Sequence, residues 1–96
     1  MESELRTAIK ENNINLVKDL IKQGIDVNYG YVWNNTALHF ASETGNFEIV
    51  KLLVDNGADV NATNDSNETA LDMVGYVYEC YDVNIANFLK EHTNLK

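Results

Sequence analysis

The sequence predicts an all-α fold: a solenoid of stacked helix-turn-helix units joined by β-turn or hairpin loops. Two observations indicate it. The chain can be laid over itself at a spacing of 33 residues, and within each copy apolar residues recur at intervals of three and four. Repetition with such a period is typical of solenoids, in which each unit packs only against its neighbours.

Two segments carry the repetition. Gly24–Asn28 reads GIDVN and Gly57–Asn61 reads GADVN, while Thr36–Leu38 and Thr69–Leu71 both read TAL. Matches of this length without a gap are not expected by chance. They therefore define the first two boundaries between units.

The 33-residue spacing fails after these matches. Ile85 and Leu89 align with Ile49 and Leu53 only at a spacing of 36, so about three residues are inserted in the last copy. We therefore predict one domain over residues 1–96, with three units: 1–30 as an N-terminal cap, 31–63, and 64–96 as a C-terminal cap with a short insertion around 74–84.

Each unit is expected to hold two short amphipathic helices. In the middle unit the first helix includes Leu38 and Ala41, and the second covers Ile49–Leu53, because apolar residues there share one helical face. Thr36 and Thr69 stand where an N-cap hydroxyl group would accept a backbone N–H.

The connections are predicted from their turn residues. Gly24 and Gly57 follow the second helices, where a left-handed C-terminal cap is needed. Residues 29–35 and 62–68 are rich in Asn, Asp, Gly and Ser and indicate tight turns or short hairpins. Asparagine tolerates positive φ best after glycine, which is expected at two equivalent positions, Asn34 and Asn67.

The segment Thr36–Ala41, read with Gly45, Ile49–Leu53 and Gly57–Ala62, resembles an ankyrin repeat. The family signature Thr-Pro-Leu-His-x-Ala is kept except that Ala37 replaces proline, and the turn glycine of the family is replaced by asparagine. The resemblance implies that the units stack and that protein partners dock on a concave face.

The resembling residues have physical roles of their own. Thr36 can cap the first helix and hydrogen-bond the imidazole of His39, which would tie adjacent turns together. A packed spine is expected from four residues: Leu38, Ala41, Val50 and Leu53. The pattern weakens in the outer units, where Arg6 and Asp72 replace the histidine and Asn12 replaces Gly45.

Composition excludes several function classes. The 96 residues carry a net charge of −8, which disfavours nucleic acid and anionic membranes as partners. No apolar run is long enough for a signal peptide or a membrane span, and a single cysteine, Cys80, suits a reducing compartment. We expect a cytoplasmic protein, or one in a host cytoplasm if the source is an intracellular parasite, symbiont or virus.

No cofactor, metal or catalytic group is predicted. His39 has the structural role described above, and His92 suits the carboxyl end of a last helix. An EF-hand loop from Asp59 fails, because Asn64 stands where glycine is needed and Leu71 where a glutamate is needed. Cys80 has acidic neighbours, which raise rather than lower the pKa of a thiol, so we do not expect an enzyme.

Aromatic residues gather in two places, and two interpretations stay open for both. Three lie in the first turn, Tyr29, Tyr31 and Trp33, and three in the insertion, Tyr76, Tyr78 and Tyr81. They could anchor an interface, or they could cover the open ends of a short core. We favour recognition for Trp33 and the covering role for the tyrosines of the insertion.

The resemblance places a binding surface on the turn tips and the first helices. The positions expected to contact a partner are Val32, Trp33, Asn35, Glu43, Thr44, Asp65, Ser66, Glu68, Tyr76 and Val77. In the first unit, Lys10 and Glu11 flank them. One aromatic anchor flanked by carboxylates suits a protein partner with a hydrophobic pocket ringed by Lys or Arg.

The predicted function is therefore that of a monomeric protein-protein interaction module. The alternative is an acidic inhibitor or mimic that blocks a basic active site or nucleic-acid groove of an enzyme; such a mimic would lose far more affinity as salt rises. Self-association through the tyrosines of the third unit is a further alternative.

Overall fold

The computed structural model describes residues 2–74 and 83–93. These residues form α-helices, one short 3-10 turn and connecting loops, and no strand occurs among them, so the all-α class is confirmed. The elements are α1 (Glu2–Lys10), α2 (Ile14–Lys22), η1 (Val32–Asn34), α3 (Ala37–Thr44), α4 (Phe47–Asp55), α5 (Ala70–Met73) and α6 (Val83–Thr93).

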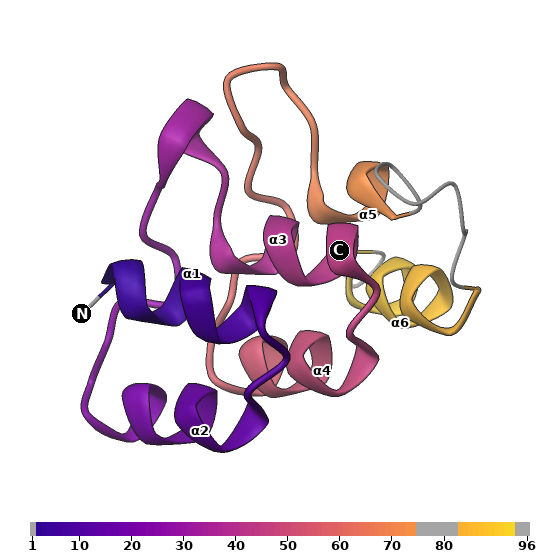
Figure 1. Ribbon diagram of the computed structural model, residues 1–96. Coiled ribbons are helices and arrows are strands. Elements are labelled where there is room, and N and C mark those ends of the chain that lie inside the picture. The colour runs from indigo at the N-terminus through magenta and orange to yellow at the C-terminus, as the bar shows by residue number, and fades with distance from the viewer. Residues whose placement is uncertain (1, 75–82, 94–96) are drawn as a thin grey trace.

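The helices form two rows (Figure 1). α1, α3 and α5 lie side by side in an inner row, α2, α4 and α6 in an outer row, and each inner helix packs on the outer helix that follows it. The loop with η1 and the loop before α5 both project beyond the inner row, on the side away from the outer helices. This arrangement leaves the turns and the inner helices to form one surface.

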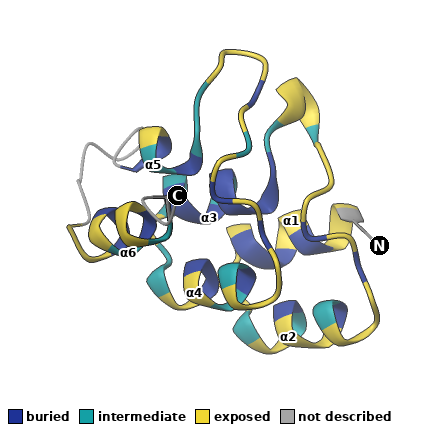
Figure 2. Ribbon diagram, turned by 180° about the vertical axis from the view of Figure 1, so that it is seen from behind, coloured by how far each residue is buried: buried dark blue, intermediate teal, exposed yellow. Residues whose placement is uncertain are grey.

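The core fills the space between the two rows. Buried residues lie where inner and outer helices face each other, whereas the tips of both projecting turns are exposed (Figure 2). The predicted spine is confirmed, because Leu38, Ala41, Val50 and Leu53 are at most 1% exposed. Burying side chains of this kind contributes about 1.5–3 kcal/mol for each large aliphatic group.

Asparagine side chains begin the outer helices. The Oδ1 of Asn13 accepts the N–H of Leu16 at 3.2 Å, and the Oδ1 of Asn46 accepts that of Ile49 at 3.1 Å. Each bond satisfies a backbone donor that the first helical turn leaves without a partner. The sequence analysis did not single out these two caps, although the 33-residue spacing relates them.

Positive φ angles fall where the sequence predicts them. Gly24 and Gly57 have φ of 90° and 97°, and Asn34 and Asn67 both have φ of 62°. Asn12, which replaces Gly45 in the first helix pair, also adopts positive φ, at 58°. Among the described non-glycine residues with positive φ, all but Trp33 are asparagines.

His39 ties the first helix of the middle pair to the next turn, as predicted. Its Nδ1 accepts the backbone N–H of Thr36 at 3.0 Å and lies 2.8 Å from the Thr36 hydroxyl group. Its Nε2 lies 2.8 Å from the carbonyl oxygen of Glu68. The neutral tautomer with the proton on Nε2 satisfies all of these contacts, so one buried ring caps α3 and also holds the following turn.

A carboxylate replaces the imidazole at α5. The Oδ2 of Asp72 accepts the backbone N–H of Thr69 at 2.9 Å and its hydroxyl group at 3.2 Å. The helix start expected at Thr69 is therefore present, and Asp72 makes the bonds at the position that His39 has in α3. Asp72 is exposed, whereas His39 is 1% exposed.

The insertion predicted in the third unit lies mostly outside the described residues. This applies to Tyr76, Val77, Tyr78, Cys80 and Tyr81. Among the helices that the structure describes, none combines the length and the apolar character needed to cross a membrane.

We predict that His39→Asp destabilises the fold by about 2 kcal/mol, because the aspartate can cap α3 but has no proton to donate to the Glu68 carbonyl group. Urea unfolding followed by circular dichroism measures the loss. The reciprocal change, Asp72→His at an exposed position, should alter the free energy of unfolding by less than about 0.5 kcal/mol. Equal losses in both variants would show that the tie to Glu68 contributes nothing.

Candidate protein-binding surface

Two turns at the edge of the inner row have the same internal hydrogen bonds. In the first turn the N–H of Tyr31 donates to the carbonyl oxygen of Asn35 at 2.8 Å. In the second turn Asn64 donates in the same way to Glu68 at 3.0 Å. The same bond therefore closes both turns at positions 33 residues apart, as the sequence spacing indicates.

The two turns are also bonded to each other. The backbone N–H of Asp65 donates to the carbonyl oxygen of Trp33 at 2.8 Å. The Nδ2 of Asn64 donates to Oδ1 of Asn35 at 2.8 Å and to Oε1 of Glu68 at 3.0 Å. Asn35 and Glu68, both predicted to contact a partner, thus have side chains that already hold the turns together.

Trp33 projects from the tip of the first turn. Its side chain is 71% exposed, more than any other large hydrophobic residue that the structure describes. Its φ is 59°, in the left-handed region, whereas Ser66 at the equivalent place in the second turn has no positive φ. A left-handed conformation costs a non-glycine residue about 1–2 kcal/mol, and burial of this ring does not offset that cost.

The two tyrosines of the first turn behave differently from Trp33. Tyr31 packs edge-on against Phe40 of α3 with ring centroids 5.5 Å apart, and Tyr29 packs against Tyr31 at 5.0 Å. Tyr31 thus packs on the inner row, and Tyr29, which is 46% exposed, packs on Tyr31. Trp33 and Val32, which is 55% exposed, are left as the apolar side chains of the tip.

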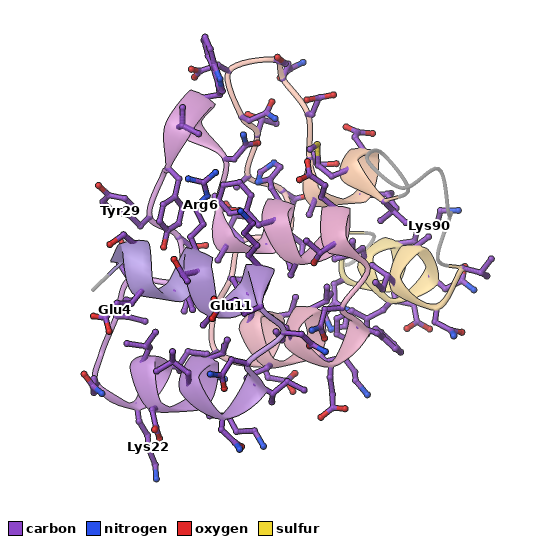
Figure 3. All side chains as sticks on the ribbon, viewed as in Figure 1. Glu4, Arg6, Glu11, Lys22, Tyr29 and Lys90 are labelled. Atoms are coloured by element: carbon purple, nitrogen blue, oxygen red, sulfur yellow. The ribbon has the colours of Figure 1, made fainter. Side chains whose placement is uncertain are left out.

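A hollow of about 170 Å³ lies between α1 and α3, on the same side as these rings. Its lining consists of Arg6, Lys10, Phe40, Glu43 and Thr44. The guanidinium carbon of Arg6 lies 4.9 Å from the centre of the Phe40 ring, a cation–π distance. In Figure 3, Arg6 points from α1 toward the first turn, whereas Lys22 points away from it on the outer row.

Two larger hollows lie elsewhere on the surface. One, of about 440 Å³, lies beside the loops that join the inner to the outer helices and is lined by polar residues such as Asn12 and Asn46. Another, of about 520 Å³, lies between α2 and α4. Neither adjoins the projecting turns, so size alone does not identify the binding surface.

Glu43, which lines the hollow of Arg6 and Phe40, is half-buried. Burial raises the pKa of its carboxyl group, and repulsion from Glu68 raises it further, while Arg6 and His39 oppose the shift. The surroundings of Glu43 thus disfavour the charged carboxylate relative to the neutral carboxylic acid.

Eight of the ten predicted contact residues lie in the described part of the chain. Val32, Trp33, Asp65 and Ser66 are exposed at the turn tips, Asn35 and Glu68 are half-buried in the same turns, and Glu43 and Thr44 line the hollow. Tyr76 and Val77 lie outside the described residues. Arg6 and Phe40 were not predicted to contact a partner, although Arg6 stands one helical turn before Lys10 on the same face.

The polar residues that suggested a calcium loop have local structural roles. The Oδ1 of Asp59 accepts the N–H of Asn61 at 2.9 Å, and the Oδ1 of Asn64 accepts the N–H groups of Ser66 and Glu68 at 3.0 Å each. Across residues 2–74 and 83–93, no group of three or more metal-ligating side chains is placed to hold an ion.

His92 also has a local partner. Its Nδ1 lies 2.8 Å from the carbonyl oxygen of Phe88, one turn earlier in α6, and its ring packs on Phe88 with centroids 4.3 Å apart. The ring thus has its partners within its own helix.

Comparison with known protein families identifies the repeat. The family described as ankyrin repeats in many copies matches residues 20–74, from the end of α2 to the end of α5. No curated protein matches the chain.

We predict that Trp33→Gly leaves the free energy of unfolding unchanged or raises it by up to about 1 kcal/mol, because glycine adopts positive φ without strain. Trp33→Val is the matched control; a β-branched residue in this conformation should lower stability by about 1–2 kcal/mol. Thermal and urea unfolding test both variants. A glycine variant clearly less stable than the wild type would show that the ring belongs to the core.

We predict that Glu43→Gln is more stable than the wild type at pH 7, by about 0.5 kcal/mol at most because solvent screens a half-exposed group. The pKa of Glu43 is raised in the fold, so its carboxylate costs stability above the folded pKa and costs nothing below the unfolded value. The difference in the free energy of unfolding between Glu43→Gln and the wild type should therefore vanish as the pH falls to about 4. Urea unfolding at both pH values measures it; an advantage that is the same at both would contradict the assignment.

Proposed function

Since the chain belongs to the ankyrin-repeat family, a family of protein-binding modules, we propose that it binds a protein partner on its concave face. The concave face comprises the turns 29–35 and 62–68 and the side of α1 and α3 that lines the hollow of Arg6 and Phe40. The interface expected for so short a surface is roughly 600–800 Å² on each side.

The conformation of Trp33 is the single observation that carries this proposal. An indole that is 71% exposed and held at positive φ gains little for the fold. The Trp33 carbonyl group is fixed by the N–H of Asp65 at 2.8 Å, so the ring is presented on an ordered backbone. An anchor ordered in advance binds without a large loss of conformational entropy, and tryptophan is the residue type most enriched in interface hot spots.

Charge mimicry is the second candidate function, favoured by the net charge of −8. The carboxylates of Asp65 and Glu68 would then face the basic groove of an enzyme. Arg6 and Lys10 line the same face, and a uniformly basic partner would meet like charges there. An aromatic-anchored interface accommodates both signs of charge more readily.

We predict that Trp33→Ala weakens partner binding by about 2 kcal/mol or more, a loss of about thirtyfold, while the variant stays folded. Affinity capture from a lysate of the source organism, and separately of its host, would identify the partner, and titration calorimetry would measure the loss. Val83→Ala is the matched control, because Val83 is another exposed hydrophobic residue, at 58%, but lies on α6 in the outer row.

Salt separates the two candidate functions. If binding depends on Trp33, the affinity should fall less than about fivefold between low and moderate salt. The affinity of a charge mimic should fall by orders of magnitude over the same range. If Trp33→Ala retains the partner and Asp65→Ala loses it in low salt only, mimicry is the better account. A partner retained by both variants would place recognition away from these turns.

A further inference from the structure

The concave face carries its charges in a fixed order. On α1, Arg6 and Lys10 line the hollow from one side. On α3, Glu43 lines it from the other side, and Glu68 of the second turn lies close enough to repel the Glu43 carboxylate. Cations therefore come first and carboxylates follow as one moves from α1 toward α5.

The charges of α1 are free to meet a partner. Among the described residues no ion pair joins Arg6 or Lys10 to a carboxylate, and the guanidinium group of Arg6 lies over the Phe40 ring. Arg6 attracts the Glu43 carboxylate across the hollow without forming an ion pair with it. The acidic residues Glu4 and Glu11 of the same chain segment are exposed but do not line the hollow. Both cations of α1 can therefore still pair with a carboxylate of a partner.

Phe40 provides an apolar surface between the two charged ends. It is partly exposed, Tyr31 packs on it from the turn side, and Arg6 lies over its ring. A side chain placed here would contact the ring and the methylene groups of Arg6 and Lys10. The face therefore offers a cation, an apolar surface and a carboxylate in sequence.

We propose that the concave face binds an extended segment of a protein partner with a matching charge order: an acidic residue at Arg6 and Lys10, an apolar residue at Phe40, and a basic residue at Glu43 and Glu68. This inference rests on the proposed function and adds to it the order of charged and apolar residues in the bound segment. A segment of uniform charge would meet like charges at one end, which disfavours it.

The helix spacing sets the distance between the two charged residues of the partner. Packed helices lie about 8–10 Å apart, and an extended chain advances about 3.3 Å per residue. The acidic and basic residues should therefore be about three residues apart where they meet α1 and α3, and up to about six where the basic residue reaches the second turn.

Selection from a random 12-residue peptide library displayed on phage tests the inference with the full chain as bait. We expect enriched peptides to carry an acidic residue, an apolar residue and then Lys or Arg at the spacing given above, in one chain direction. The fluorescence anisotropy of the best peptide should give an affinity about tenfold higher than that of the same peptide with its acidic and basic residues exchanged, which corresponds to about 1.4 kcal/mol.

Charge-reversed variants provide the matched comparison. The variant with Arg6→Glu, Lys10→Glu and Glu43→Lys should invert the preference and bind the exchanged peptide about tenfold more tightly than the original. Lys22→Glu, the same kind of reversal on the outer row, should leave both affinities within about twofold. Circular dichroism and thermal unfolding would verify that all variants are folded.

Three outcomes would overturn the inference. If the enriched peptides have uniform charge, or if the charge-reversed variants do not change which peptide order is preferred, the face does not select partners by charge order. If the binding of such peptides still depends on Trp33, the proposed function remains valid without this inference. Failure to enrich any peptide would exclude an extended segment as the occupant. The proposed function itself is decided separately, by partner capture with Trp33→Ala and Val83→Ala.

Discussion

The concave face depends on the hydrogen bonds that tie the first turn to the second. Both turns project beyond the inner helices (Figure 1), so their backbone groups cannot be satisfied by helical bonds. The imidazole of His39 donates to the Glu68 carbonyl group, and the N–H of Asp65 donates to that of Trp33. These ties order the surface before any partner arrives, which lowers the entropy that binding must offset.

Much of the fold could be predicted because its determinants are short in range. Caps, left-handed asparagines and the apolar spine are set by neighbouring residues or by a helical period, and the 33-residue spacing copies them along the chain. The tie from His39 to the next turn was predicted from the ankyrin signature in which this histidine stands. The contact of Arg6 with Phe40 was not predicted, because it joins residues 34 positions apart through packing that neither residue encodes alone.

The backbone conformation of Trp33 is a second feature that could not be predicted from the sequence. Ser66 occupies the same place in an equivalent turn without positive φ, so position in the turn does not determine φ there. The sequence singled out Trp33 through its residue type, and only the structure reveals its backbone strain. Glu43 likewise reads as one more surface acid until its burial is known. Both residues cost the fold stability, and both lie on the concave face, as is common for groups retained for function rather than for folding.

His39 and Asp72 cap equivalent helices with different chemistry. An imidazole has two nitrogens, so it can accept the Thr36 N–H with one and donate to the next turn with the other. A carboxylate can only accept, so Asp72 caps α5 but has no proton to offer to a further carbonyl group. Within residues 2–74 and 83–93, the turns at 29–35 and 62–68 are joined by these hydrogen bonds. A surface of two ordered turns and two inner helices suits a short extended segment better than a broad globular face, which is why the order of charges across it, rather than its area, is expected to determine which partner binds.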